Sequence, residues 1–458
     1  MRFFMPDWDD RVDPSYNFLT DEHSVAHAAN PRKNDAYMWE LFGIDNVPFD
    51  GVLVSKLQVY NNERKAREVA KNGIHAYLRL PEHFPVLGDC GAFGYINQDK
   101  PPIQTKDILD YYLHAGVNYA VSIDHLVVQS VRVLDKEGNP TKETRELTRA
   151  EKEERVAVTT RNAIDFWKEW ECTPAYKERF TPLAGVQGEG PADYAKCLRD
   201  ILAETQYSYV AIGGLVRRQT KEILKILREI HPIVKQHNLQ LHVFGVFRLD
   251  AIPDLYRLGV RSFDSASRLR KSWLSNHENY YFQRRSYTGL RVPQPDQSTK
   301  TRKLVRQNPD QFSTLFQDLQ NKCLAILRDF HADPEGVTVE KVIEVLTEYT
   351  KYFAPDLKLL KWYRETLQER PWQRCTCPIC KEIGVEVIIF RGNNRNRRRG
   401  FHNVYVEYFE LQKILESISD NGAEIVKDME GINETTKSPR KRPLTYYLKT
   451  KTPSSHEE

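Results

Sequence analysis

The chain has 458 residues, of which 40% are hydrophobic and 28% are charged, and its formal net charge is +4. Length and apolar content predict a globular protein of two to four domains, and so small a net charge does not by itself indicate a nucleic-acid partner. The charged N-terminus is not a signal peptide and no run of 18 apolar residues occurs, which favours a soluble, cytoplasmic protein with no membrane partner.

Residues 1–50 are acidic, aromatic and rich in turn formers, and we expect them to form an irregular N-terminal arm. From residue 51 apolar segments alternate with helical patterns. Eight strands are expected, at residues 52–59, 75–80, 86–88, 119–123, 183–186, 209–212, 241–246 and 260–263. This alternation over residues 51–271 predicts an α/β fold with a (β/α)8 TIM-like barrel. A doubly wound open sheet is the alternative.

Polar residues, glycines and one phenylalanine lie at the carboxyl ends of many of these strands. They are Asp89, Asp124, Gln187, Gly213 with Gly214, Phe244 with Gly245, and Asp264. The carboxyl ends of parallel barrel strands meet at one rim, where barrel enzymes hold their catalytic groups. Taken alone, Asp264 is equally well explained as the cap of a following helix. The recurrence of such residues at successive strand ends favours a catalytic rim.

The segment after the barrel, residues 272–370, predicts no chemistry. Residues 272–309 are polar, aromatic and basic, and we expect a long loop there. Helical patterns follow near residues 310–331, 338–353 and 356–370, and their apolar spacing is adequately explained by packing.

A cysteine cluster indicates a metal site. Cys375, Cys377 and Cys380 lie within six residues, and His402 follows. Three thiolates and one imidazole are the ligands of a tetrahedral structural zinc ion, so we predict a zinc-binding subdomain at residues 371–430. His331 is the alternative fourth ligand. An odd total of seven cysteines also favours a metal site in a reducing compartment over a disulfide framework.

Five arginines lie between the cysteines and the histidine: Arg391, Arg395, Arg397, Arg398 and Arg399. A solvated charged loop is one explanation. So high a density of guanidinium groups beside a metal site favours phosphate contact, and we predict a basic, nucleic-acid-binding loop. Residues 431–458 are basic, and we expect a disordered tail that adds non-specific electrostatic attraction.

The ordered motifs GDCGAFGY, SIDH, GVQGEG, AIGGL, HVFGV, FDSAS and CTCPIC resemble those of the tRNA-guanine transglycosylase superfamily, over residues 85–270 and 375–415. The chain departs from the tRNA enzymes in its N-terminal arm, in CGAFG where they usually have SGGFQ, in the helical segment before the cysteines, and in lacking a recognisable C-terminal RNA-binding domain. These departures, and the opening FFMPDWDDRVDPSYNFLTDE, resemble the DpdA-type DNA 7-deazaguanine transglycosylases.

The resemblance implies replacement of guanine in DNA by 7-cyano-7-deazaguanine (preQ0), with other proteins of a DNA-modification system as possible partners. Asp264 would be the nucleophile and Asp89 the acid and base. Asp124, Gln187 and the backbone of Gly213 and Gly214 would bind the base edge, and Phe93 and Phe244 would stack on its faces. No redox or nucleotide cofactor is implied. A tRNA-modifying enzyme and a non-catalytic nucleic-acid-binding subunit of the same fold are the alternatives.

Overall fold

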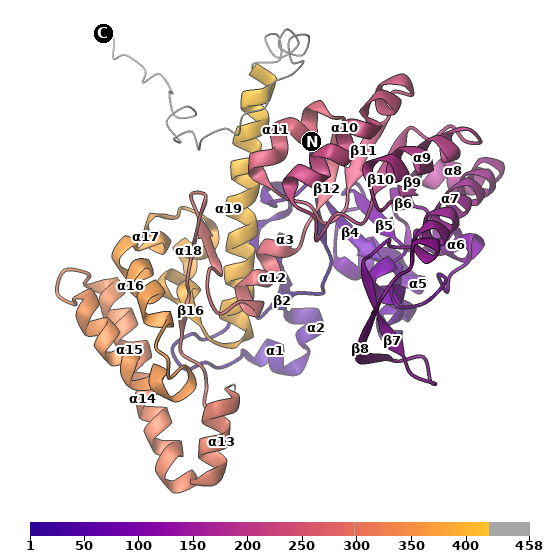
Figure 1. Ribbon diagram of the computed structural model, residues 1–458. Coiled ribbons are helices and arrows are strands. Elements are labelled where there is room, and N and C mark those ends of the chain that lie inside the picture. Colours follow the sequence, from indigo (N-terminus) through magenta and orange to yellow (C-terminus); the bar gives the residue numbers. More distant parts are fainter. Residues whose placement is uncertain (297, 421–458) are drawn as a thin grey trace, which may run out of the picture. The chain divides into compact units, whose positions relative to one another are not determined.

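The computed structural model describes residues 1–296 and 298–420. Its central element is a closed barrel of parallel strands surrounded by helices (Figure 1). In barrel order the strands are β1 (Arg2–Pro6), β12 (Val260–Asp264), β11 (Gln240–Val243), β10 (Tyr209–Ile212), β9 (Thr181–Val186), β6 (Tyr119–Val121), β5 (Val86–Asp89) and β4 (Gly51–Ser55). The predicted TIM-like barrel is confirmed.

One predicted strand is wrong, and the true eighth strand comes from the N-terminal segment. Residues 75–80 form the end of helix α5 (Glu63–Leu78) and the turn after it, because Ile74, His75 and Leu78 are buried at helical spacing. Strand β1 instead lies between β4 and β12, and Phe4 pairs with both Gly51 and Asp264. The segment expected to be an irregular arm therefore begins inside the barrel.

The barrel interior is filled by a cluster of inward-facing side chains, most of them from six of the eight strands. The buried members are Phe4, Leu53, Leu87, Val121, Leu183, Tyr209 and Ala211, with Tyr119 and Phe244 packed against them. Burial of this cluster removes apolar surface from water and holds the strands in register. Polar side chains at the carboxyl ends of the strands lie above it.

Helices connect the strands and cover the outside of the barrel. Around the barrel these are α4 (Lys56–Tyr60), α5, α6 (Thr105–Ala115), α7 (Arg149–Cys172), α8 (Pro174–Arg179), α9 (Pro191–Leu202), α10 (Thr220–Gln236) and α11 (Ile252–Arg257). A hairpin of β7 (Ser130–Leu134) and β8 (Pro140–Glu146) interrupts the connection between β6 and α7 (Figure 1). Between β1 and β4 lie β2 (Arg11–Val12), α1 (Val25–Ala29), α2 (Pro31–Asn34), β3 (Ala36–Tyr37) and α3 (Met38–Phe42).

The part after the barrel is more ordered than the sequence predicted. Helices α14 (Pro309–Ala332), α15 (Val339–Phe353) and α16 (Leu359–Glu369) confirm the three expected helices. The expected long loop instead contains α12 (Ser267–Leu274), β13 (Tyr280–Phe282), β14 (Arg285–Tyr287), β15 (Leu290–Arg291) and α13 (Thr299–Gln307). Then follow α17 (Pro371–Arg374), α18 (Pro378–Ile383), β16 (Ile389–Phe390) and α19 (Gly392–Asp420).

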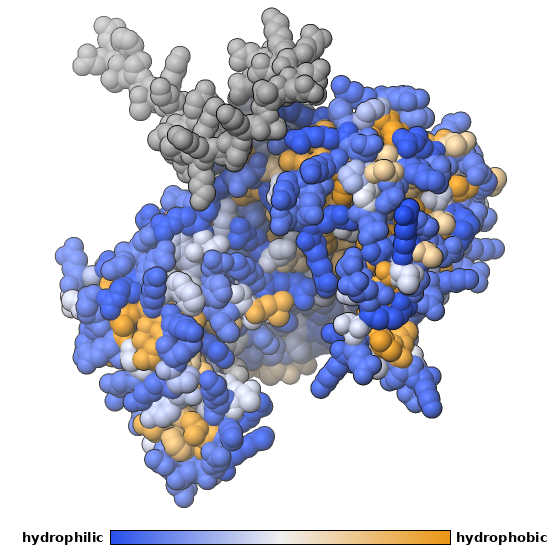
Figure 2. Space-filling view, in the orientation of Figure 1, coloured by the Kyte–Doolittle hydropathy of each residue, from blue (hydrophilic) through white to orange (hydrophobic). Residues whose placement is uncertain are grey.

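Hydrophilic side chains predominate on the face shown in Figure 2. Within the described part of the chain, no helix has the length and apolar character needed to span a membrane. The predicted basic tail, residues 431–458, lies outside the described residues.

Candidate active site and metal centre

The carboxyl ends of the barrel strands surround a pocket of about 910 Å³. Its wall includes Phe93 and all the strand-end residues predicted from the sequence except one: Asp89, Asp124, Gly213, Gly214, Phe244, Gly245 and Asp264. Three carboxylates from β5, β12 and the segment after β6 thus share one cavity. The exception is Gln187, which lies behind the wall.

Asp264, the last residue of β12, is held through one of its two oxygens. Its Oδ1 accepts a hydrogen bond from the Gly245 amide at 2.9 Å and lies 3.3 Å from His242 Nε2. Gly245 adopts a positive φ of 69°, which favours glycine. Among the described residues none hydrogen-bonds Oδ2. The carboxylate is therefore fixed through Oδ1, and its residue lines the pocket.

A buried chain of polar groups continues from Asp264 into the barrel. The Ser262 hydroxyl lies 2.6 Å from His242 Nδ1 and 2.5 Å from the Tyr209 hydroxyl. His242 and Ser262 are adjacent across β11 and β12, and both are fully buried. His242 was missed in the sequence, although a polar residue two positions before Phe244 on an apolar strand was a usable signal.

Asp89 at the end of β5 has the electrostatic properties of a proton-transfer group. Burial raises its pKa to about 7, and the negative charges of Asp124 and Asp264 act in the same direction. A hydrogen bond from Ser55 opposes the shift. The buried Asp89 Oδ1 has no hydrogen-bond partner among the described residues. A carboxyl group poised near neutral pH can both give and accept a proton.

Asp124 is buried and connected to two neighbours. Its Oδ2 accepts a hydrogen bond from Gln187 Nε2 at 2.6 Å, and its Oδ1 accepts one from the Cys90 thiol at 3.2 Å. Burial raises the Asp124 pKa, while these two hydrogen bonds lower it. Gln187 is fully buried and its Oε1 finds no partner among the described residues. The structure therefore places Gln187 behind Asp124 rather than against the pocket.

Gly213 and Gly214 follow β10 at a point where neighbouring side chains leave little room for a further side chain. A Cβ on Gly213 would lie 2.0 Å from Gln187 Nε2, so no side chain fits there. The Gly213 amide donates to the Val186 carbonyl, and its own carbonyl accepts from the Tyr194 hydroxyl. Because Gly213 has no side chain, the Gln187–Asp124 hydrogen bond can form beside it and the pocket is not filled at this point.

The two predicted stacking rings lie at different depths. Phe244 is half-buried and packs on the barrel core, whereas Phe93, from the 3-10 turn after β5, is 62% exposed. Both line the same pocket.

The four predicted metal ligands converge in a second, buried site. Cys375, Cys377 and Cys380 place their Sγ atoms 3.6, 3.3 and 3.3 Å from His402 Nδ1. A tetrahedral zinc ion with ordinary Zn–S and Zn–N bonds requires a sulfur–nitrogen separation of about 3.6 Å, so the donor set fits. The group can therefore hold a metal ion.

Neighbouring groups orient the histidine of this metal centre. His402 Nε2 donates to the Tyr281 carbonyl at 2.8 Å, which turns Nδ1 toward the thiols. The Tyr280 ring stacks on the imidazole with a centroid separation of 4.1 Å. The alternative ligand, His331, is not in the cluster; it contacts Trp372 and Gln373 instead.

The predicted basic loop is wrong. Arg391 immediately precedes α19, and the other four arginines lie in its first turns. The exposed fractions of Arg391, Arg395, Arg398 and Arg399 are 6%, 1%, 0% and 0%. Only Arg397 has a partly exposed side chain, at 33%. Guanidinium groups enclosed in this way are not available to phosphate.

Internal partners explain this burial. Arg395 pairs with Glu386 at 2.6 Å and with Asp21, and Asp21 also pairs with Arg391 at 2.6 Å. Arg398 donates to Asp13 and Asn394, while Arg399 donates to the carbonyls of Val387, Ile389 and Ser272. The cluster of arginines in the sequence therefore forms internal ion pairs and hydrogen bonds that join the N-terminal segment to the start of α19.

Comparison with known proteins decides the family. No protein-family model matches the chain. A DNA-guanine transglycosylase of Salmonella montevideo is 33% identical over 438 residues, covering 92% of this chain and 99% of that protein. The chain belongs to the DNA-guanine transglycosylase family. A tRNA-guanine(15) transglycosylase of Saccharolobus solfataricus is 24% identical over 228 residues, covering 49% of this chain and 41% of that protein.

Membership of the DNA-guanine transglycosylase family confirms the resemblance found in the sequence. The chain is a pentosyltransferase of the guanine transglycosylase kind. In the present chain, three carboxylates and two rings line one barrel pocket, and a buried Cys3His cluster lies apart from it.

Proposed function

We propose that the enzyme exchanges guanine in DNA for a 7-deazaguanine base, 7-cyano-7-deazaguanine (preQ0), through a covalent glycosyl-aspartate intermediate. The observation that carries the proposal is the pairing of a held carboxylate, Asp264, with an acid of pKa about 7, Asp89, in one pocket. The name of the Salmonella relative supports DNA as the substrate.

The exchange consists of two displacements at the same carbon. Asp264 Oδ2 attacks the anomeric carbon, the bond to guanine breaks, and Asp89 gives its proton to the leaving base. The incoming 7-deazaguanine then loses its ring N–H proton to the Asp89 carboxylate and attacks the same carbon, which frees Asp264. Configuration is retained because it inverts twice.

Base recognition falls to the remaining groups of the pocket. Asp124 hydrogen-bonds the purine edge, and Gln187 holds Asp124 in place through the 2.6 Å contact. The backbone of Gly213 and Gly214 lets the base approach closely, and Phe93 and Phe244 stack on its faces. A base inside a duplex cannot reach this pocket, so the target guanine is extruded or unpaired.

The Cys375, Cys377, Cys380 and His402 cluster binds zinc in a structural role. All four positions are protein ligands, so none is left for a substrate. None of the seven cysteines forms a disulfide, which fits a cytoplasmic enzyme. Further proteins of a DNA-modification system are candidate partners.

A competition experiment tests the substrate. DNA and tRNA are offered together with labelled 7-cyano-7-deazaguanine and with any required partner proteins. We expect label in DNA and none in tRNA, and none in either with Asp264→Asn. Label in tRNA alone would overturn the proposal and favour the second candidate, tRNA exchange, which rests on the more distant tRNA-guanine(15) relative.

A further inference from the structure

Large apolar side chains gather at the mouth of the active-site pocket. Eight large hydrophobic side chains among the described residues are exposed, and four of these line this one pocket. They are Trp8, Phe93, Val216 and Leu274, exposed by 40%, 62%, 45% and 65%. Isolated exposed apolar residues need no explanation, but a group around a substrate pocket indicates a binding surface.

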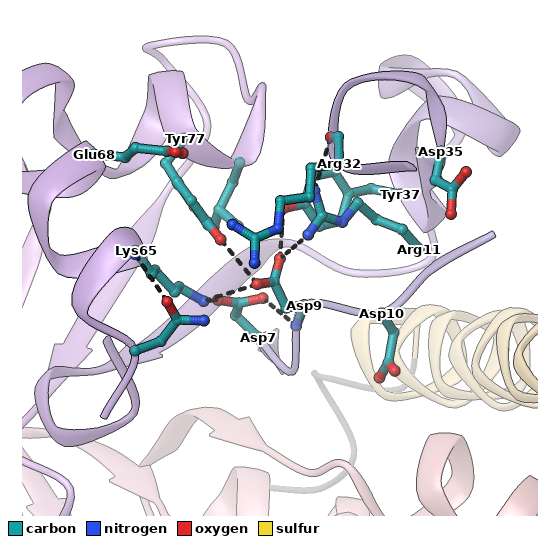
Figure 3. Close-up of polar contacts among 12 residues, drawn as sticks. Asp7, Asp9, Asp10, Arg11, Arg32, Asp35, Tyr37, Lys65, Glu68 and Tyr77 are labelled. Atoms are coloured by element: carbon teal, nitrogen blue, oxygen red, sulfur yellow. Dashed lines mark hydrogen bonds and ion pairs between the residues drawn. The ribbon is translucent and has the colours of Figure 1, made fainter. Parts of the chain in front are cut away.

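Trp8 lies between two residues, Asp7 and Asp9, whose side chains are anchored (Figure 3). Asp7 pairs with Lys65 Nζ at 2.5 Å, and both side chains are buried. Asp9 accepts hydrogen bonds from the hydroxyls of Tyr37 and Tyr77, each at 2.8 Å. The backbone on both sides of Trp8 is thus already ordered, so binding of a ligand to the indole costs little further conformational entropy of this segment.

Positive charge accompanies these apolar side chains. Arg270 and Lys271 lie in α12, which begins just after Asp264, and both line the pocket. The Arg270 guanidinium carbon lies 4.3 Å from the centre of the Trp8 ring, and Lys271 pairs with Glu278 at the surface. Rings beside cations match the alternating bases and phosphates of a nucleic-acid strand.

We propose that this rim, formed by Trp8, Val216, Leu274 and Arg270 beside Phe93, binds the nucleotides that flank the extruded guanine in one DNA strand. The flanking bases stack or pack on Trp8, Val216 and Leu274, and Arg270 contacts the adjoining phosphate. The rim thereby replaces the stacking that the strand loses around the target base. The inference rests on the proposed function, and it supplies the DNA contacts that the buried arginines of α19 cannot make.

Binding of a fluorescent single-stranded oligodeoxynucleotide with one central guanine tests the rim. Trp8→Ala is expected to weaken binding about tenfold, because one base loses its stacking partner. Leu274→Ala is expected to weaken it by a smaller factor, about threefold. Leu19→Ala is the matched control, since Leu19 is 71% exposed and does not line the pocket. It should bind as the wild type does.

Steady-state exchange with the same oligonucleotide separates the possible outcomes. The rim predicts a higher KM for DNA in Trp8→Ala and Leu274→Ala, with an unchanged KM for the free base. If both variants bind the oligonucleotide as the wild type does while label still enters DNA, the proposed role of the rim is contradicted and the proposed function still holds. Label entering only tRNA would overturn the proposed function instead. If Trp8→Ala fails to fold, the exposed Leu274 position decides alone.

Discussion

His242 Nε2 lies 3.3 Å from Asp264 Oδ1, and the imidazole is completely buried in the barrel. Its other nitrogen faces the Ser262 hydroxyl at 2.6 Å, so the ring orientation is fixed from both sides. His242 is therefore a positioning residue for the proposed nucleophile, because it touches Asp264 and does not line the pocket.

Replacement of His242 by Phe should slow covalent adduct formation about 10- to 100-fold, because a hydrogen bond to a charged group is lost. Single-turnover trapping of the DNA adduct measures this rate. The KM for DNA should not change, since His242 lies beneath the pocket. Tyr209→Phe removes a hydroxyl that is three contacts from Asp264, through Ser262 and His242, and should have a smaller effect. Equal losses in the two variants would point to general disruption of the core.

Release of guanine should depend on pH through Asp89. The leaving base needs the protonated acid, and burial raises the Asp89 pKa to about 7. The single-turnover rate of guanine release should therefore be highest below pH 7 and fall as pH rises through that value. A rate that stays constant from about pH 6 to about pH 8.5 would contradict the assignment of Asp89 as the acid.

The same pKa shift predicts a stability change with the opposite sign from that of a salt-bridged aspartate. The Asp89 pKa is 3.8 when unperturbed and about 7 in the folded chain, so the unfolded state loses the proton first. The contribution of Asp89 to the free energy of unfolding is fully present below its pKa in the unfolded chain and is lost as pH rises through its folded pKa of about 7. Asp89→Asn should therefore raise Tm relative to the wild type at about pH 8 more than at about pH 4. Thermal unfolding at the two pH values measures the difference.

Asp124→Ala should raise the KM for the free 7-deazaguanine base by about 10- to 100-fold, because buried donors of the base lose their acceptor. If Gln187 acts only by holding Asp124, Gln187→Ala should raise the same KM to a smaller extent. The double variant should then be no worse than Asp124→Ala. Additive effects would instead indicate that Gln187 contacts the base directly.

The metal centre predicts about one zinc ion per chain. Cys377→Ala should abolish stoichiometric zinc and lower Tm, as measured by elemental analysis and thermal unfolding. Cys172→Ala is the matched control, because Cys172 is an exposed thiol outside the cluster. Full zinc content in purified Cys377→Ala would refute the ligand assignment.

The buried arginines should matter for stability and not for DNA binding. Arg395→Met removes one of the two cations that pair with each acid, leaving Asp21 with Arg391 and Glu386 with Arg328, and should cost roughly 1.5–3 kcal/mol of unfolding free energy. Arg397→Met, at a partly exposed position, should cost about 1 kcal/mol or less. Denaturant unfolding measures both. A flatter salt dependence of DNA affinity in Arg395→Met would restore the phosphate-binding interpretation.

Local patterns predicted the rim and the metal centre because each depends on residue type at a defined position. An acid after an apolar strand, such as Asp264, must lie at the carboxyl end of the barrel. Long-range pairing was not predictable in this way. The side-chain pattern around His75 fits a strand as well as a helix, and Arg395 is neutralised by Asp21, far away in the sequence. Gln187 matched its motif, but only the packing against Gly213 placed it behind Asp124.

Strand β1 also sets the order of events while the chain is made. It is synthesised first, but one of its two neighbours in the barrel, β12, ends at Asp264. At the usual speed of translation, the ribosome needs roughly 10 to 50 seconds to add that many residues, and until then the growing sheet keeps two open edges. Phe4 and Asp264 are register partners, so the pairing that closes the ring also fixes the proposed nucleophile. The carboxylate proposed to react therefore takes up its place in the same step that removes the open edges of the sheet.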